Sequence, residues 1–189
     1  IHQFAAITGA RGFVWAELNG DGNPDARILD AADHLHVFRN ERSGRFVEEP
    51  LPASVGEVKA ITAADASHNG VLDLLAVRDD GAILRLARRD DGASWDATGI
   101  AQVPDVQSYL AGEVRLRAAD IDNNGANDLQ LSRVTPANNQ PGALLWLGGA
   151  DGTFAPVEKL TISPTVVDVA DLSGNGRLDL LGLSADSQP

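Results

Sequence analysis

The sequence predicts an all-β protein made of four repeats of short strands, and three observations lead to this prediction. A nine-residue loop rich in Asp, Asn and Gly recurs four times along the 189 residues. Alternating apolar segments with β-branched and aromatic residues flank each loop, a pattern typical of strands. No segment shows an apolar helical stripe over ten or more residues.

The four loops align without gaps and begin about fifty residues apart. Each has an acid at position 1 and an oxygen-bearing side chain at position 3. Each also has Asp or Asn at position 5, Gly at position 6 and Asp at position 9. These loops are Glu17–Asp25 (loop one), Asp65–Asp73 (loop two), Asp120–Asp128 (loop three) and Asp171–Asp179 (loop four).

Short apolar strands are expected on both sides of every loop. The strands before the loops are Phe13–Ala16, Val58–Ala63, Val114–Ala118 and Val166–Ala170. The strands after them are Ala26–Leu29, Leu74–Val77, Leu129–Ser132 and Leu180–Leu183. In the first three repeats a third strand follows, at His34–Phe38, Ala82–Leu86 and Ala143–Leu147. A glycine turn then leads to an aromatic residue, which is Phe46, Trp95 or Phe154.

Each repeat therefore has the length and strand content of one blade of a β-propeller with four-stranded antiparallel blades. We expect a single domain over residues 1–189, with blades at about 10–52, 55–104, 110–160 and, incomplete, 163–189. A blade cannot bury both faces alone, so it packs against its neighbours. A stacked β-solenoid is the alternative fold, although solenoid repeats are usually shorter.

Composition excludes several classes of function. Apolar residues make up 43% of the chain, which is enough for a packed core. The net charge of −12 argues against a nucleic-acid partner, because such proteins present basic patches. No apolar stretch is long enough to insert into a membrane as a helix. The absence of cysteine excludes disulfides and thiolate metal sites.

The loops have the chemistry of calcium sites. Ca²⁺ takes about 6–8 oxygen ligands, which side chains at positions 1, 3, 5 and 9 and a carbonyl at position 7 would supply in a tightly curled loop. Glycine at position 6 allows the turn. The expected ligand residues are Glu17, Asn19, Asp21, Asn23, Asp25, Asp65, Ser67, Asn69, Val71, Asp73, Asp120, Asp122, Asn124, Ala126, Asp128, Asp171, Ser173, Asn175, Arg177 and Asp179.

Two other interpretations of the loops were weighed. An EF-hand needs Glu at position 12 and a helix on each side. Position 12 is Ile28, Ala76, Leu131 or Gly182 here, each on an expected strand. Asp/Asn/Gly runs also form plain hairpin turns, but four loops in register with aspartate at position 9 favour calcium. Loops one and three carry three acids each and loops two and four carry two, so we expect loops one and three to fill first.

The D-x-[DNS]-x-[DN]-G-x-x-D loop between two short strands resembles the FG-GAP/VCBS repeat. This resemblance covers nearly the whole chain and implies part of a seven-bladed propeller, as in integrin α subunits and many bacterial secreted and surface proteins. It implies Ca²⁺ in each loop, joining the first and second strands of a blade. It also implies a protein or glycan partner on a propeller face, and an extracellular, cell-surface or periplasmic location.

Four repeats are fewer than seven blades, and the fourth ends at Pro189 without its third strand. We therefore expect a segment of a larger propeller, completed by the rest of its own polypeptide or by a neighbouring subunit. The alternative is a small ring in which Ile1–Ile7 completes the fourth blade.

Other residue groups point away from an enzyme. His34 and His36 lie two apart on an expected strand and could form a metal pair, but a half-exposed strand explains them better. No nucleophile elbow or phosphate-binding glycine loop is present. Trp15, Trp95 and Trp146 are expected in the core, although exposure on one face would suit a sugar platform. The insertion Thr135–Pro141 is the longest excursion from the repeat.

The sequence thus favours a calcium-binding β-propeller module that acts as an interaction or adhesion scaffold and not as an enzyme. One alternative is a carbohydrate-binding or non-catalytic domain of a secreted carbohydrate-active enzyme. Another is a structural subunit of an extracellular assembly.

Overall fold

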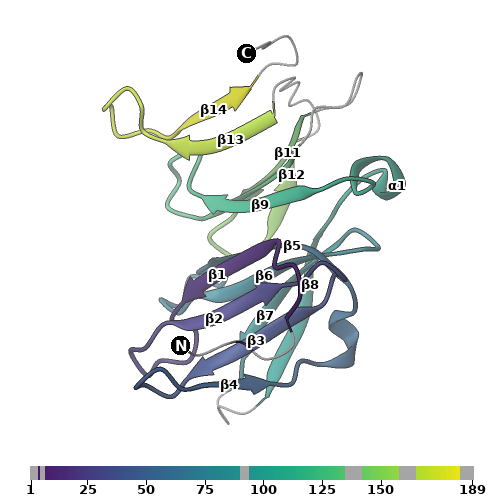
Figure 1. Cartoon of the computed structure of the whole chain (residues 1–189). Coiled ribbons are helices and arrows are strands. Elements are labelled where there is room, and N and C mark those ends of the chain that lie inside the picture. The colour runs from purple at the N-terminus through teal and green to yellow at the C-terminus, as the bar shows by residue number, and fades with distance from the viewer. Residues whose placement is uncertain (1–3, 5–6, 90–93, 135–141, 158–164, 184–189) are drawn as a thin grey trace.

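The computed structural model describes residues 4, 7–89, 94–134, 142–157 and 165–183, and this part of the chain is all-β (Figure 1). Three sheets have four strands each, adjacent in chain order, and a fourth sheet has two. All pairings are antiparallel, which confirms the predicted strand content of the first three repeats. Sheet one is β1 (Gly12–Ala16), β2 (Asp25–Leu29), β3 (Leu35–Asn40) and β4 (Phe46–Glu49); sheet two is β5 (Val58–Ala64), β6 (Asp73–Arg78), β7 (Ala82–Arg88) and β8 (Trp95–Gln102); sheet three is β9 (Val114–Ala119), β10 (Asp128–Arg133), β11 (Ala143–Gly148) and β12 (Phe154–Pro156); sheet four is β13 (Thr165–Ala170) and β14 (Asp179–Leu183).

Strand positions agree closely with the sequence-based prediction. The fourth strands β4, β8 and β12 begin at the aromatic residues Phe46, Trp95 and Phe154. Sheet four has two strands within the described residues, and residues 184–189, like the insertion Thr135–Pro141, lie outside them. Helical structure in the described residues is limited to α1 (Val106–Tyr109) and a 3₁₀ turn at Ala53–Val55.

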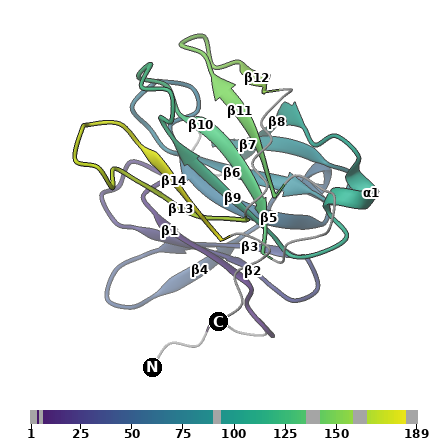
Figure 2. The ribbon, with the colours of Figure 1, turned by 90° about the horizontal axis from the view of Figure 1, so that it is seen from above.

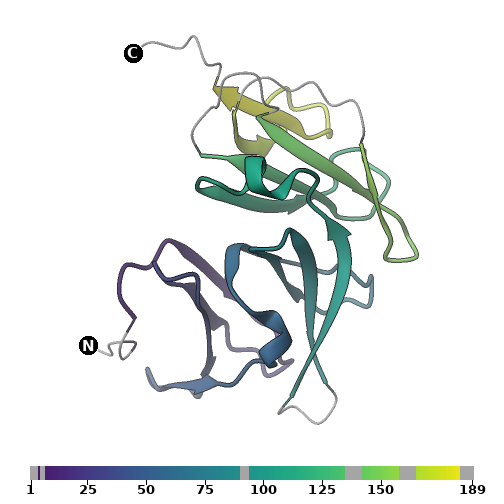
Figure 3. The same ribbon diagram turned by 90° about the vertical axis from the view of Figure 1, so that its right-hand side faces the viewer.

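Neighbouring sheets pack face to face in chain order, with sheets one and two below and sheets three and four above (Figures 1 and 3). Strand β6 shows how one strand serves two interfaces. Leu74 and Ala76 lie in the core shared with sheet one, whereas Leu75 and Val77 lie in the core shared with sheet three. Sheet two is therefore buried on both faces.

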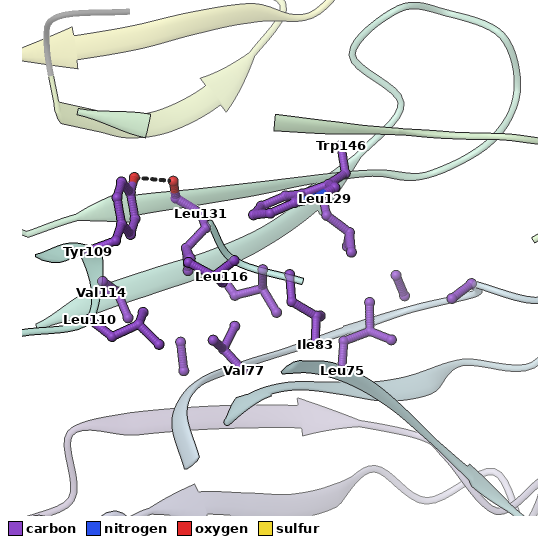
Figure 4. Packing of buried hydrophobic residues seen from close by; sticks show 14 residues of the cluster. Leu75, Val77, Ile83, Tyr109, Leu110, Val114, Leu116, Leu129, Leu131 and Trp146 are labelled. Carbon is purple, nitrogen blue, oxygen red and sulfur yellow. Dashed lines mark hydrogen bonds between the residues drawn. The ribbon is translucent and has the colours of Figure 1, made fainter. Parts of the chain in front are cut away.

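The core between sheets two and three gathers apolar side chains around Trp146, which is 2% exposed (Figure 4). Tyr109 of α1 belongs to the same core, and its hydroxyl donates a 2.9 Å hydrogen bond to the carbonyl of Leu131. Burial raises the pKa of Tyr109 far above its usual range. The short helix therefore closes this interface from the segment that links the two sheets.

The interface between sheets one and two includes buried charge. Arg27 of β2 is fully buried, and its guanidinium lies 5.5 Å from the ring centroid of Trp95 in sheet two. Arg88 lies over the same ring and forms two contacts of 2.6 and 2.9 Å with Glu49 of sheet one. Because removal of one partner would leave a buried charge uncompensated, this group of charges ties sheet one to sheet two.

The outer face of sheet one is partly uncovered. Phe4 and Ile7 pack on Ala26, Ile28 and Phe38 there, so the described N-terminal residues lie on sheet one and not beside sheet four. Among the described strands, none of sheet four pairs with sheet one, and Figure 2 shows the sheets from above without a closed ring of strands.

The prediction that all three tryptophans are buried is wrong for one of them. Trp95 and Trp146 are buried, but Trp15 is 49% exposed and stacks on Phe13, which is 56% exposed. Trp15 lies on the edge strand β1, and its ring approaches Phe46 on the outer face. Within the described residues this face has no neighbouring sheet, so the aromatic side chains stay accessible.

Candidate metal-binding loops

Each of the four loops joins the first and second strands of its sheet, from β1 to β2, β5 to β6, β9 to β10 and β13 to β14. Glycine at position 6 has a left-handed backbone in all four loops, with φ of 77° at Gly22, 82° at Gly70, 88° at Gly125 and 81° at Gly176. No atom would lie within 4 Å of an added Cβ at these sites. Conformation, and not space, therefore selects glycine there.

Position 4 is also left-handed in all four loops, which the sequence interpretation missed. The φ values are 76° at Gly20, 55° at His68, 63° at Asn123 and 67° at Gly174. Position 4 is Gly in two loops and Asn in a third, and these residues tolerate the left-handed region best, so their recurrence was the available signal. His68 occupies it at a conformational cost.

The side-chain oxygen at position 5 shapes the loop in the same way in each repeat. It accepts a hydrogen bond from the backbone N–H at position 7, which makes a local turn. The pairs are Asp21 with Asn23 at 2.8 Å, Asn69 with Val71 at 2.8 Å, Asn124 with Ala126 at 2.7 Å, and Asn175 with Arg177 at 2.8 Å.

The acid at position 1 organises the loop backbone. In loops two to four, its two oxygens accept the N–H groups of positions 5 and 6, at 2.8–3.1 Å. Glu17 instead uses one oxygen for the N–H groups of Asn19 and Gly20, both at 2.8 Å. The longer side chain therefore holds the first half of loop one and not its centre.

The aspartate at position 9 connects the loop to the sheet. In loops three and four, Asp128 and Asp179 accept the N–H groups of positions 2 and 3. Asp128 also accepts the N–H of Gly148, at the end of β11, at 2.8 Å. Asp25 does the same with Asn40 at the end of β3, also at 2.8 Å. This residue thus joins the loop to the third strand of its own sheet in sheets one and three.

Loop three brings three carboxylates together. One oxygen each from Asp120, Asp122 and Asp128 lies within 4.8 Å of the others. This is the one cluster of at least three metal-ligating His, Cys, Asp or Glu side chains found in the described part of the chain. The amide of Asn124 also donates to the Gly148 carbonyl at 2.9 Å, which holds loop three against β11. The donor set is all oxygen, as Ca²⁺ prefers.

Loop one does not bring its three acids together in this way. Asp25 is fully buried, and its second oxygen lies 3.2 Å from the guanidinium of Arg27. Burial raises the pKa of Asp25. Asp21 points outward, and the N–H of Asn23 lowers its pKa. Loops one and three thus have the same number of acids, but their carboxylates are arranged differently.

Loop two contains buried oxygens without partners. Ser67 Oγ at position 3 and Asp73 Oδ2 at position 9 have no partner at normal hydrogen-bond geometry within the described residues. Burial raises the pKa of Asp73, although Ser67 and the Ala66 N–H lie near enough to lower it against this larger effect. Unsatisfied buried oxygens cost free energy, and a cation between them would remove that cost. Loop two therefore fits an oxygen-liganded ion, which Asp65 and Asn69 would complete.

Loop four is the most open of the four. All its residues from Asp171 to Arg177 are exposed. The N–H of Gly176 lowers the pKa of Asp171 by donating to its carboxylate. The loop backbone therefore keeps the shared shape without the burial that surrounds loops one and three.

The histidine pair lies apart from these loops. His34 precedes β3, and its Nδ1 lies 3.5 Å from Asp30 Oδ2, which also contacts His36 Nε2 at 3.2 Å. His36 Nδ1 contacts Glu48 at 2.8 Å. Burial lowers the pKa of His36, but the hydrogen bonds to Glu48 and Asp30 outweigh it, so the pKa is raised overall. Both rings thus lie on one side, as predicted.

Comparison with known families agrees with the repeat pattern. Residues 17–76 match the family described as FG-GAP-like repeat, from loop one through loop two and into β6. The chain carries an FG-GAP-like repeat. No curated protein matches the chain. No helix among the described residues is long and apolar enough to cross a membrane.

Proposed function

We propose that this chain is a calcium-binding module of β-propeller type that serves as an extracellular or cell-surface interaction scaffold and not as an enzyme. The carboxylate cluster of Asp120, Asp122 and Asp128 is the observation that best supports it. The shared backbone of the other three loops extends the proposal to them, and the FG-GAP-like repeat at residues 17–76 is consistent with the blade arrangement.

Calcium would act structurally in this proposal. Bound to a loop, it offsets repulsion between nearby carboxylates and fixes the hairpin between the first two strands of a sheet. A ligand that binds the folded state stabilises it by about 2.7 kcal/mol at a hundredfold excess over its Kd. Thermal melts with Ca²⁺ and with EGTA, read beside calcium stoichiometry from calorimetry, test this. An unchanged melting temperature and no binding heat would refute it.

Exchanging the position-3 residues of loops two and three tests whether the loops themselves bind the ion. Position 3 is Asp122 in loop three and Ser67 in loop two. Asp122→Ser should remove the tightest binding event, because site affinity follows ligand charge. Ser67→Asp should tighten calcium binding at loop two for the same reason. If Asp122→Ser leaves every calcium affinity unchanged, the cluster does not bind the ion.

Glycan binding is a second candidate function, because Trp15 and Phe13 form an exposed stacked pair with centroids 5.9 Å apart. Aromatic faces of this kind suit sugar rings and protein partners alike. Trp15→Ala should weaken binding to a glycan array, whereas the buried Trp146 lies outside the reach of a glycan.

A further inference from the structure

A cavity of about 260 Å³ lies where the inner edge strands of sheets one, two and three meet. Its walls come from Arg11–Phe13 at the start of β1, Leu29 at the end of β2, Lys59–Ile61 of β5 and Glu113–Arg117 at the start of β9. The metal-binding loops lie at the opposite ends of these strands. The cavity is therefore separate from every loop described above.

The charge of the cavity contrasts with that of the whole chain. Arg11, Lys59, Arg115 and Arg117 line it, together with one carboxylate, Glu113. The chain has 15 Lys and Arg residues and a net charge of −12, so more than a quarter of its cations lie at this one cavity. Such local concentration of positive charge in a concave site attracts anions.

Two of the cations are fixed in place by other groups. Arg11 and Lys59 both pair with Asp33, one on each carboxylate oxygen. Arg11 also donates to the carbonyls of Asp30 at 3.0 Å and Val58 at 2.9 Å. Asp33 holds this position with a left-handed backbone, φ 67°. The wall formed by sheets one and two is thus preorganised before any ligand binds.

The other two cations lie together on β9. Arg117 donates long hydrogen bonds to Val166 and Ser132, at 3.4 and 3.5 Å. Burial lowers the pKa of Arg117, the nearby carboxylate of Asp168 raises it, and the charge of Arg115 lowers it by a smaller amount. Arg115 is exposed and forms no hydrogen bond or ion pair with another described residue. An anion beside this pair would relieve the repulsion and accept charge-assisted hydrogen bonds.

Phe13 is the one aromatic residue among those that line the cavity, and it lies at the edge of β1 with its side chain on the outer face of sheet one. Its ring is 56% exposed and is backed by Trp15 at an interplanar angle of 22°. An aromatic face next to a group of cations matches a ring that carries an acidic substituent. We propose that this cavity binds an anionic sugar, with its carboxylate or phosphate against the cations and its ring on Phe13. The proposal rests on the glycan-binding candidate and does not require calcium.

The test is titration calorimetry of the whole chain, in Ca²⁺ and in EGTA, with three probes: a uronate oligosaccharide, a sugar phosphate and a neutral oligosaccharide. We expect binding by an anionic probe that weakens as salt rises. Preference for the uronate or for the phosphate identifies which acidic group the site takes. Binding of the neutral probe alone would overturn the inference but leave glycan binding intact.

Variants locate the site. Arg115→Gln should weaken binding about tenfold, as expected for loss of one charge-assisted hydrogen bond. Phe13→Ala should weaken binding of the two anionic sugars but not of inorganic phosphate, which is titrated as a fourth probe. Arg45→Gln is the matched control, because Arg45 is 72% exposed and pairs with Glu41 in the β3–β4 turn. No binding by either anionic sugar at about 10 mM, or equal affinity in Arg115→Gln, would overturn the proposal.

Discussion

Replacing Asp128 with alanine should destabilise the chain strongly even without calcium. The Asp128 carboxylate is fully buried and accepts N–H groups from Ile121 at 2.7 Å, Asp122 at 3.2 Å and Gly148 at 2.8 Å. The Gly148 N–H is buried, so its loss of a partner costs about 1–3 kcal/mol. The two loop N–H groups can be hydrated and add about 1 kcal/mol each. We expect a total of about 3–5 kcal/mol.

Asp179→Ala is the matched comparison at position 9 of loop four. Asp179 accepts two loop N–H groups, at 3.0 and 3.2 Å, from the exposed Leu172 and Ser173. Water can replace both bonds, so the expected cost is about 1–2 kcal/mol. Urea unfolding in EGTA, followed by tryptophan fluorescence with the m-value as a check on cooperativity, measures both variants. An equal loss of stability in the two would refute the argument that Asp128 joins its loop to β11.

Three further outcomes are expected. Gln130→Leu should stabilise the chain by about 1–3 kcal/mol, because the buried Gln130 amide has no hydrogen-bond partner within the described residues. Gly148→Ala should destabilise it by about 2–3 kcal/mol, because the new Cβ would lie 2.1 Å from the Asn127 carbonyl oxygen. The raised pKa of His36 means that its contribution is present below about pH 6.5 and is lost as pH rises through the folded-state pKa. His36→Gln should therefore flatten the fall in stability above that pH.

Each of these three predictions has a control variant or an outcome that would contradict it. Gln102→Leu, at an exposed glutamine, should not increase the stability of the chain. A loss of stability in Gln130→Leu would mean that the Gln130 amide does have hydrogen-bond partners. Gly99→Ala adds a Cβ with no atom within 4 Å and should be tolerated, so equal losses would contradict the clash at Gly148. For His36, identical pH profiles of the variant and the parent chain would rule out the carboxylate contacts as the cause.

The repeat was predictable from sequence because local chemistry determines it. Position-6 glycine, the Asn or Asp at position 5 and the period-two strands act within a few residues of one another, and all appear in the structure. The second left-handed residue, at position 4, was missed because loop two has His68 there and not a glycine that would indicate a left-handed backbone. A single sequence shows such a site only when the other loops are compared position by position.

Features that depend on contacts between neighbouring sheets could not be predicted from the sequence. Arg27 and Leu75 occupy the same repeat position, yet Arg27 is buried because Trp95 and Asp25 happen to accommodate its charge. Trp15 is exposed because the outer face of sheet one has no adjacent sheet in the described residues. The cavity likewise depends on three strands that lie far apart in the chain. Spacing and composition carry no information about such contacts.

The acid at position 1 has a consequence for the chemical lifetime of the protein. Every loop contains an Asn-Gly pair, the dipeptide most prone to deamidation, in which the glycine nitrogen attacks the asparagine side chain. In all four loops that nitrogen donates its hydrogen to the position-1 acid, at Gly20, Gly70, Gly125 and Gly176. The nitrogen attacks only after it has lost that hydrogen as a proton, and a hydrogen bond to a carboxylate disfavours this loss. We therefore expect the position-1 acid to slow deamidation in its own loop, and a chain that loses this acid should accumulate isoaspartate at the Asn-Gly pair of the proposed ion site.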